Sequence, residues 1–291
     1  MTARRRSVHF VPGGNERFWA KALAGAADTL IIDLEDSVPA ERKPAARAAA
    51  LEWLADRGPL ATTPGREAMV RVNAVATPWG RDDVEAIATA GTDSLMVPKV
   101  DGPADLDTVA GWLAGAGGAD TVALFPVATE TALGALNVHA VAAHPRVDGL
   151  CWGAEDLSAE VGATSSRRPD GSLRPLFETV RHLCLLGAAA AGVGAVDAVF
   201  TDLRDLAGLR RECEDAAAMG FTGKITVHPD QIEVVNEVFT PSAGALERAQ
   251  ALVEAFAVNE TAGRSAFLFD GQMVDAPHLA RARRLLARMA P

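Results

Sequence analysis

Two acidic side chains stand just after neighbouring apolar runs of this sequence, in an arrangement that could hold a metal ion. Glu130 follows the run at residues 122–127, and Asp156 follows the next run, at residues 147–153. If these runs are adjacent parallel strands, the two carboxylates approach each other at one edge. Carboxylate, carbonyl and water oxygens form the hard site that Mg²⁺ prefers, with positions left for a bidentate substrate. The spacing fits a helix N-cap or an ordinary ion pair equally well.

Arg71 lies between two valines inside another apolar run, where an unpaired charge would be costly. An anionic group therefore has to face it. A structural interpretation pairs Arg71 with Asp36 or Glu35, which follow the run at residues 29–34. In a functional interpretation, its planar fork of donors binds a substrate carboxylate or a developing oxyanion. The two interpretations are compatible, because a partner acid can orient the arginine that binds substrate.

Lys99 offers a rival, metal-free route, since a lysine on a strand could form a Schiff base with a carbonyl substrate. The acid-rich surroundings would keep its amine charged and lower its nucleophilicity, so we favour the metal route. His228 could act as a base, although a histidine at a strand end is more often a hydrogen-bonded structural group. Cys151 lies in an apolar run and is best interpreted as a small buried hydrophobe.

The elements that must position these side chains follow from short aliphatic and β-branched runs bounded by turn residues. There are eight such runs, at residues 8–12, 29–34, 68–73, 94–99, 122–127, 147–153, 195–200 and 223–228. Ala-rich segments that favour helices lie between them, for example at residues 15–26, 39–54, 82–90, 104–114 and 205–219. Eight strand–helix repeats over roughly 230 residues predict an α/β protein, a (β/α)8 TIM barrel with its chemistry at the carboxyl ends of the strands.

The sequence after the eighth strand exceeds what one closing helix needs. We predict a barrel catalytic domain at residues 1–240 and a C-terminal helical extension at residues 241–291. The extension is expected to hold helices at residues 241–257 and 276–289, with a short hairpin or loop near residues 265–271. Such additional helices can pack on a neighbouring subunit, as we expect here. Within the barrel, the polar segment 157–175 is the longest break, and long loops of this kind are usually functional or mobile.

Composition excludes several other classes of protein. The 291 residues carry 28 Lys and Arg against 38 Asp and Glu, a formal net charge of −10 that disfavours nucleic-acid and anionic-membrane binding. The three cysteines are widely spaced and form no C-x-x-C pair, so we expect a reducing cytoplasm. Glycines interrupt the longest charge-free stretch, residues 183–196, which is too short to span a membrane. The basic first residues lead into a strand-like run, and no secretory signal is expected.

Taken together, the ordered motifs of nearly the whole chain resemble those of the HpcH/HpaI aldolases. The similarity is to the citrate lyase β-subunit-like branch, which includes malyl-CoA and citramalyl-CoA lyases. It rests on Phe10-Val11-Pro12-Gly13, Asn15-Glu16-Arg17-Phe18, Asp33-Leu34-Glu35-Asp36, Val70-Arg71-Val72-Asn73, Val97-Pro98-Lys99, Glu130-Thr131-Ala132, Gly153-Ala154-Glu155-Asp156, His228-Pro229 and Phe239-Thr240-Pro241-Ser242.

The resemblance implies a Mg²⁺-dependent carbon–carbon lyase that assembles as a homotrimer or homohexamer. Its substrate would be a 3-hydroxyacyl-CoA such as malyl-CoA, citramalyl-CoA or citryl-CoA, cleaved to acetyl-CoA and a 2-oxo acid. By the same resemblance, Glu130 and Asp156 bind the metal, and Arg71 binds the substrate. Arg17 and Lys21 match positions near the CoA moiety.

Further roles follow for three acids. Glu35 and Asp36 would position Arg71 and metal-bound water. The segment at residues 273–277 matches the place where a neighbouring subunit delivers an acid to the site, which makes Asp275 a catalytic candidate. Asp275 could also cap the last helix, a role that does not exclude catalysis.

Three alternatives stay open at this stage. The same scaffold could hydrolyse an acyl-CoA thioester, with free CoA and an intact hydroxy acid as products. It could instead act as a citrate lyase β subunit on a thioester carried by an acyl carrier protein. It could also be a non-catalytic binding protein, although the complete set of acids and the arginine argues against this.

Overall fold

The computed structural model describes residues 4–56, 60, 63–118, 120 and 122–287, and the chain divides into two compact units. The first is Met1–Phe239 and the second is Thr240–Pro291. Each unit is described by itself below. Among the helices of the described residues, none is both long and apolar enough to cross a membrane.

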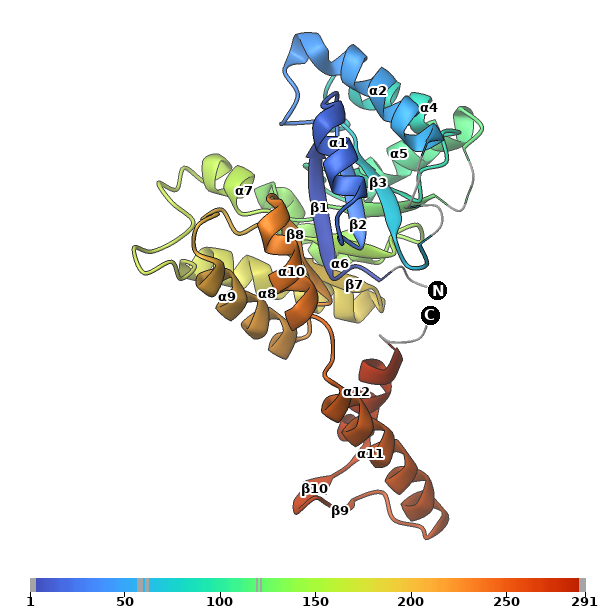
Figure 1. Cartoon of the computed structure of the whole chain (residues 1–291), viewed down its shortest axis with the longest axis vertical. Coiled ribbons are helices and arrows are strands. Elements are labelled where there is room, and N and C mark those ends of the chain that lie inside the picture. Colours follow the sequence, from blue (N-terminus) through green and yellow to red (C-terminus); the bar gives the residue numbers. More distant parts are fainter. Residues whose placement is uncertain (1–3, 57–59, 61–62, 119, 121, 288–291) are drawn as a thin grey trace. The chain divides into compact units, whose positions relative to one another are not determined.

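The first unit is an eight-stranded parallel barrel (Figure 1). Its strands are β1 Ser7–Pro12, β2 Thr29–Asp33, β3 Glu67–Arg71, β4 Ser94–Val97, β5 Ala123–Pro126, β6 Gly149–Cys151, β7 Gly194–Asp197 and β8 Gly223–Thr226. They pair in the order β5-β4-β3-β2-β1-β8-β7-β6. Single bridges from Leu124 to Val147 and from Val127 to Cys151 join β5 to the β6 segment. The predicted (β/α)8 barrel is therefore confirmed.

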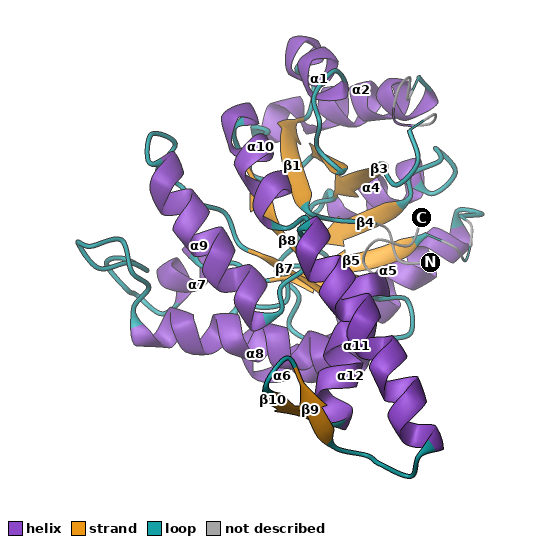
Figure 2. Cartoon of the chain, turned by 60° about the horizontal axis from the view of Figure 1, so that its bottom comes forward, coloured by secondary structure: helices purple, strands orange, loops and turns teal. Residues whose placement is uncertain are grey.

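Each strand of the first unit is followed by at least one helix, and the helices surround the strands (Figure 2). The helices are α1 Glu16–Leu23, α2 Lys43–Ala55, α4 Gly80–Ile87, α5 Pro103–Gly115, α6 Ala132–Ala142, α7 Glu155–Glu160, α8 Pro175–Ala191, α9 Leu206–Met219 and α10 Pro229–Val238. Side chains of Asn15, Thr131 and Asp205 accept a backbone N–H at the starts of α1, α6 and α9. These caps explain where the three helices begin.

Two apolar layers form the core of the barrel, because successive strand residues point to opposite faces. Val8, Ile31, Met69, Met96 and Phe125 belong to the cluster inside the barrel. Alternate residues such as Leu30, Ile32 and Val70 pack instead against the surrounding helices. Burial on both faces accounts for the nearly continuous apolar runs in the sequence.

The strands end earlier than their apolar runs suggested, which matters for the site. β4 stops at Val97 because Pro98 cannot donate to the ladder, so Lys99 lies in the following loop. β3 stops at Arg71, and Asn73 binds the Leu34 carbonyl and the Asp83 carboxylate instead. The polar segment predicted as one break at residues 157–175 opens with α7, which reaches Glu160.

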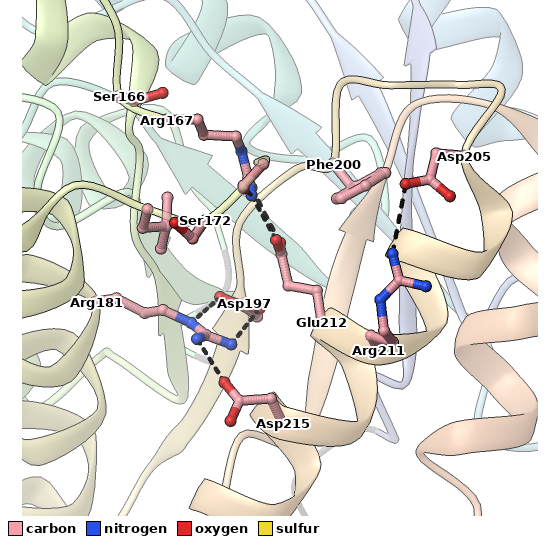
Figure 3. A network of polar contacts seen from close by, with 12 residues as sticks. Ser166, Arg167, Ser172, Arg181, Asp197, Phe200, Asp205, Arg211, Glu212 and Asp215 are labelled. Atoms are coloured by element: carbon pink, nitrogen blue, oxygen red, sulfur yellow. Dashed lines mark hydrogen bonds and ion pairs between the residues drawn. The ribbon is translucent and has the colours of Figure 1, made fainter. Parts of the chain in front are cut away.

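A buried ion network ties the outside of the barrel wall to α8 and α9 (Figure 3). Asp197 of β7 accepts from Arg181 of α8 at 3.0 Å and from Lys224 Nζ at 2.9 Å, while the Trp152 indole donates to it at 2.7 Å. Lys224 also contacts Glu212 of α9 at 2.8 Å. Neither Asp197 nor Lys224 is exposed at all. Each charge is compensated, and this makes burial of the whole network tolerable.

The second unit holds α11 Ala243–Thr261, α12 Ala276–Ala287 and a hairpin of β9 Phe267–Phe269 and β10 Gln272–Val274. Its small core contains Phe256, Val274 and Leu279. Asp270 and Gly271 form the two-residue turn, both with positive φ, as such turns require. The hairpin falls where the sequence predicted a hairpin or loop, and residues 288–289 of the predicted last helix lie outside the described part.

We expect the Asp197→Asn substitution to lower the free energy of unfolding by about 3–5 kcal/mol, because it leaves Lys224 and Arg181 as buried, undercompensated cations. Denaturant unfolding monitored by circular dichroism measures this difference. The matched control is Asp215→Asn, since Asp215 contacts the same Arg181 at 3.0 Å but its side chain is 62% exposed. There we expect a loss of about 1 kcal/mol or less.

The pH dependence of the Asp197→Asn effect tests whether the lost stability comes from the charge of Asp197. Burial alone would raise the pKa of Asp197, but Lys224 and Arg181 outweigh it and hold the pKa at about 2. The unfolded pKa is about 3.9, so this stabilisation is complete above that pH and is lost as the pH falls towards 2. The gap between the parent and Asp197→Asn should therefore shrink between about pH 4 and pH 2. A gap that stays constant over this range would contradict the argument.

Candidate active site

Charged side chains from consecutive βα units converge at the carboxyl end of the barrel, where barrel enzymes carry their chemistry. Asp33 ends β2 and Arg71 ends β3. Lys99 follows β4, Glu130 follows β5, and Asp156 lies in the first turn of α7 after β6. Because these strands are neighbours in one parallel sheet, side chains far apart in sequence come within contact distance.

Arg71 is held from two sides by carboxylates. Its Nε and Nη2 donate to the two oxygens of Asp33 at 2.7 and 2.8 Å, and its Nη1 lies 3.0 Å from Glu35 Oε2. The Phe10 ring lies beneath it, 4.6 Å from the guanidinium carbon to the ring centroid. A bidentate pair on an aromatic ring fixes the plane of the guanidinium.

Asp33 is the partner that sequence reasoning missed. In the sequence it is one acid of the motif that also contains Glu35 and Asp36, and local pattern does not show which of them faces Arg71. The register of β2 and β3 places Asp33 directly opposite Arg71. Burial alone would raise the pKa of Asp33, but the hydrogen bonds and charge of Arg71 outweigh burial and lower that pKa. Of the two partners proposed for Arg71, Glu35 contacts it, whereas Asp36 contacts Lys99.

Glu130 is a buried carboxylate in acidic surroundings, with 6% of its surface exposed. Its Oε2 accepts the backbone N–H of Lys99 at 2.7 Å. Burial, followed by the negative charges of Glu35 and Asp156, raises the pKa of Glu130 to about 8. Gly153 permits its position, because a Cβ there would lie 2.5 Å from Glu130 Cγ. A carboxylate forced into such surroundings is stabilised by an added cation.

Lys99 places its ammonium among three carboxylates. Nζ contacts Glu35 Oε1 and lies 3.3 Å from both Asp36 Oδ2 and Asp156 Oδ1. Burial opposes its charge, but the hydrogen bond and charge of Glu35 prevail, and the pKa of Lys99 is raised. A protonated amine is not a nucleophile, so the geometry argues against the Schiff-base route.

The remaining predicted residues belong to other elements of the chain. Arg17 and Lys21 are exposed on α1, which Trp19 anchors by stacking on Trp53 of α2 at 5.0 Å between ring centroids. Asp275 belongs to the second unit, where its carboxylate lies 2.6 Å from His278 Nδ1 at the start of α12.

Two weaker candidates of the sequence analysis have structural roles. His228 caps α10, because its Nδ1 accepts the backbone N–H of Asp230. Cys151 is 2% exposed inside the barrel, where burial raises the pKa of its thiol. His228 therefore serves the start of a helix, and Cys151 belongs to the apolar cluster inside the barrel.

The donor set suits a cation that takes few protein ligands. Among the described residues, no three His, Cys, Asp or Glu side chains are arranged to enclose a metal ion. Glu130 and Asp156 supply two carboxylates, both in contact with Lys99. Mg²⁺ usually binds through one or two carboxylates and completes its shell with water and substrate oxygens. The residues present therefore fit magnesium better than a metal that needs a cage of side chains.

Comparison with known proteins identifies the family. A model of the HpcH/HpaI aldolase/citrate lyase family matches residues 6–229. The chain belongs to this family. The resemblance inferred from the motifs is thereby confirmed.

Relatives in the HpcH/HpaI family carry names with different reactions. The chain is 41% identical to a (3S)-malyl-CoA thioesterase of Cereibacter sphaeroides over 285 residues, 97% of this chain and 94% of the relative. It is 37% identical to human mitochondrial citramalyl-CoA lyase, over 96% of this chain and 84% of the relative. A crystal structure of the protein CitE from Mycobacterium tuberculosis with magnesium, acetoacetate and coenzyme A is 38% identical, with a TM-score of 0.80 and 99% of both chains covered.

The buried charge of Glu130 should cost stability when no metal is present. An acid with a folded pKa of about 8 destabilises the protein progressively as the pH rises from its unfolded pKa, about 4.3, through 8. With EDTA present at pH 9, we therefore expect Glu130→Gln to raise the melting temperature by at least about 2 °C. The gap should shrink as the pH falls and should be smallest at about pH 4, where the acid is largely protonated in both the folded and the unfolded state. The control is Glu160→Gln, an exposed acid of α7, which should change neither value.

Proposed function

We propose that this chain is a Mg²⁺-dependent carbon–carbon lyase acting on a 3-hydroxyacyl-CoA such as malyl-CoA, citramalyl-CoA or citryl-CoA. Cleavage would yield acetyl-CoA and a 2-oxo acid, and the reverse condensation would use the same groups. The observation that carries the proposal is the joint position of Arg71, Glu130 and Asp156 at the barrel mouth, with Arg71 fixed by Asp33 and Glu35. Relatives named as a citramalyl-CoA lyase and as a CoA-bound and magnesium-bound protein support it.

Glu130 and Asp156 would hold the magnesium ion. Bound there, the ion would supply a Lewis acid for the carboxylate and carbonyl oxygens of the 2-oxo acid. Burial and the neighbouring acids disfavour the charged form of Glu130 in the protein alone, and a bound cation would stabilise that form.

Arg71 would bind the substrate oxygen on which negative charge develops. A guanidinium carries five N–H donors, and Asp33 and Glu35 engage only part of this fork. Because both partners are buried, the guanidinium is oriented before substrate arrives. A fixed donor needs little reorganisation as charge develops, which is how such groups lower a barrier.

Asp275 would carry the proton of the acetyl methyl group. In condensation its carboxylate takes that proton as the new carbon–carbon bond forms. In cleavage the substrate hydroxyl would give its proton to solvent as the carbon–carbon bond breaks. Protonated Asp275 would give its proton to the enolate carbon and regain one from solvent. We propose that Asp275 reaches the barrel of a neighbouring subunit in a homotrimer or homohexamer, since it lies outside the barrel unit.

Arg17 and Lys21 would bind phosphates of CoA. They lie four residues apart on one face of α1, whose first turn is at the carboxyl end of the barrel because α1 follows β1. Both are exposed, so they would supply locally the positive charge that the acidic chain lacks.

Thioester hydrolysis is the second candidate, favoured by the relative named as a malyl-CoA thioesterase. The same carboxylates and Arg71 would then serve the attack of water on the thioester carbon, with the carbon–sulfur bond broken and the carbon–carbon bond kept. A third possibility, action on an acyl carrier protein thioester, is suggested by a relative named citrate lyase subunit beta-like protein from Mycobacterium tuberculosis.

The deciding experiment supplies purified protein with Mg²⁺ and with malyl-CoA, citramalyl-CoA or citryl-CoA, and identifies products by mass spectrometry. We expect acetyl-CoA and a 2-oxo acid from at least one thioester. Turnover should be lost in EDTA and fall by at least about 100-fold in Asp156→Asn, because the metal site is broken. The control Asp170→Asn changes an exposed loop acid and should keep full activity.

Other products would redirect the assignment. Free CoA with an intact hydroxy acid would establish the thioesterase and reject the lyase. If no free CoA ester turns over while the same acyl groups react on an acyl carrier protein, the carrier-dependent reaction is correct.

Asp275 is tested by complementation between subunits. Asp275→Asn should reduce kcat by about 100-fold or more while keeping the helix start, since Asn caps helices as well as Asp does. Co-expression of Asp275→Asn with Asp156→Asn should restore part of the activity, because a mixed oligomer then contains an intact site. No recovery in isolated mixed oligomers would place the acid elsewhere. Asp270→Asn, in the exposed hairpin turn of the same unit, is the control.

A further inference from the structure

Lys99 touches both carboxylates assigned above to the metal, and it does so with two different groups. Its backbone N–H donates to Glu130 Oε2 at 2.7 Å. Its side-chain Nζ lies 3.3 Å from Asp156 Oδ1. One residue therefore engages an oxygen of each proposed ligand, which no role in the reaction described so far requires.

The backbone of Lys99 adopts a conformation that its residue type disfavours. Its φ is +51°, and among the described non-glycine residues only Asp270 shares a positive φ. The left-handed region costs a residue with a Cβ about 1 kcal/mol or more. Here that cost coincides with a backbone N–H aimed at Glu130 and an ammonium placed among carboxylates. Strain retained at such a point indicates a functional constraint.

Positive charge is scarce in this cluster. Among the described residues, the ion pairs join four carboxylates, those of Asp33, Glu35, Asp36 and Asp156, to two cationic side chains, Arg71 and Lys99. A fifth carboxylate, that of Glu130, accepts the Lys99 backbone N–H. Arg71 is committed to Asp33 by two hydrogen bonds. The Lys99 ammonium is thus the cation that neutralises Asp156.

The Lys99 contacts differ in strength, and this suggests which of them can change. Nζ is closest to Glu35 Oε1, whereas Asp36 and Asp156 are each 3.3 Å away. The side chain is 30% exposed, and a lysine stem has several rotatable bonds. Nζ can therefore withdraw from Asp156 without leaving Glu35.

We propose that the Lys99 ammonium is a built-in counter-ion of the metal carboxylates, which must leave Asp156 when Mg²⁺ binds and then remains with Glu35 and Asp36. Lys99 is accordingly a positioning residue that sets the Mg²⁺ affinity of the site. The proposal rests on the proposed function, because it takes Glu130 and Asp156 as the metal ligands. It adds that the site competes with its own side chain for magnesium.

The test measures Mg²⁺ binding directly, by isothermal titration calorimetry on the full chain without substrate. Removing the competing charge in Lys99→Met should tighten Mg²⁺ binding by about tenfold or more, because a like charge within a few ångströms opposes a divalent cation. Without metal, the same variant should melt at a lower temperature than the parent. Saturating Mg²⁺ should then raise its melting temperature by more than it raises that of the parent.

Two further variants keep the test independent of folding defects. Lys99→Asn removes the charge with a residue that tolerates positive φ, and it should also bind Mg²⁺ more tightly than the parent. Lys99→Arg keeps the charge and should return the affinity to within about threefold of the parent. Arg210→Met removes one positive charge from the exposed ion pair with Glu237 and should leave the affinity unchanged.

Failure of this inference is distinguishable from failure of the proposed function. If the parent binds Mg²⁺ and Asp156→Asn does not, but both neutral Lys99 variants bind it equally or more weakly, the metal site stands and the counter-ion role is rejected. If Asp156→Asn binds Mg²⁺ as the parent does, or neither binds it, the assignment of the metal ligands fails, and the counter-ion role fails with it.

Discussion

Buried carboxylates require positive partners, and this constraint determines the arrangement of charged side chains in two regions. One is the carboxyl end of the barrel, and the other is the layer between the strands and the surrounding helices. A charge removed from water without a partner costs several kcal/mol, so each buried acid either meets a cation or shifts its pKa. Asp197 meets Lys224 and Arg181, and its pKa falls. Among the described residues, no cationic side chain forms an ion pair with Glu130, and its pKa rises. The same physical rule therefore yields a closed network in one place and an under-compensated one in the other.

The difference between the two networks separates stability from chemistry. Around Asp197, donors and acceptors come from α8, α9, β7 and β8, and each buried charge is paired with an opposite charge of the same network. Such a network fixes how helices lie against strands and offers nothing to a ligand. At the mouth, Glu35, Asp36, Glu130 and Asp156 face two cations, one of which Asp33 already holds. An excess of negative charge around the buried Glu35 and Glu130 is unfavourable for the isolated protein and suits a divalent cation.

Close approach of backbone segments brings these acids together. Gly153 lets Glu130 lie where a side chain would exclude it, and the left-handed Lys99 turns its N–H towards the same carboxylate. Asp33 and Arg71 form their bidentate pair because β2 and β3 place them opposite each other. One close approach, at Gly153, and one disfavoured backbone torsion, at Lys99, thus both serve the position of the Glu130 carboxylate. The result is a set of fixed donors with one adaptable element, the lysine side chain.

Local pattern was sufficient for the architecture. Eight aliphatic runs bounded by turn residues predicted the strands because parallel barrel strands are buried on both faces, and the end of each run located the acids at the mouth. Local order also narrowed the partner of Arg71 to Glu35 or Asp36, and the structure shows Glu35 in contact with it. Asp33 and the contacts of Lys99 did not, because they depend on register between strands and on one backbone torsion. The sequence by itself therefore determined which elements form and which end of the barrel is charged. Only the tertiary structure decided which carboxylate faces which cation, because that choice depends on distances of a few ångströms between segments far apart in the chain.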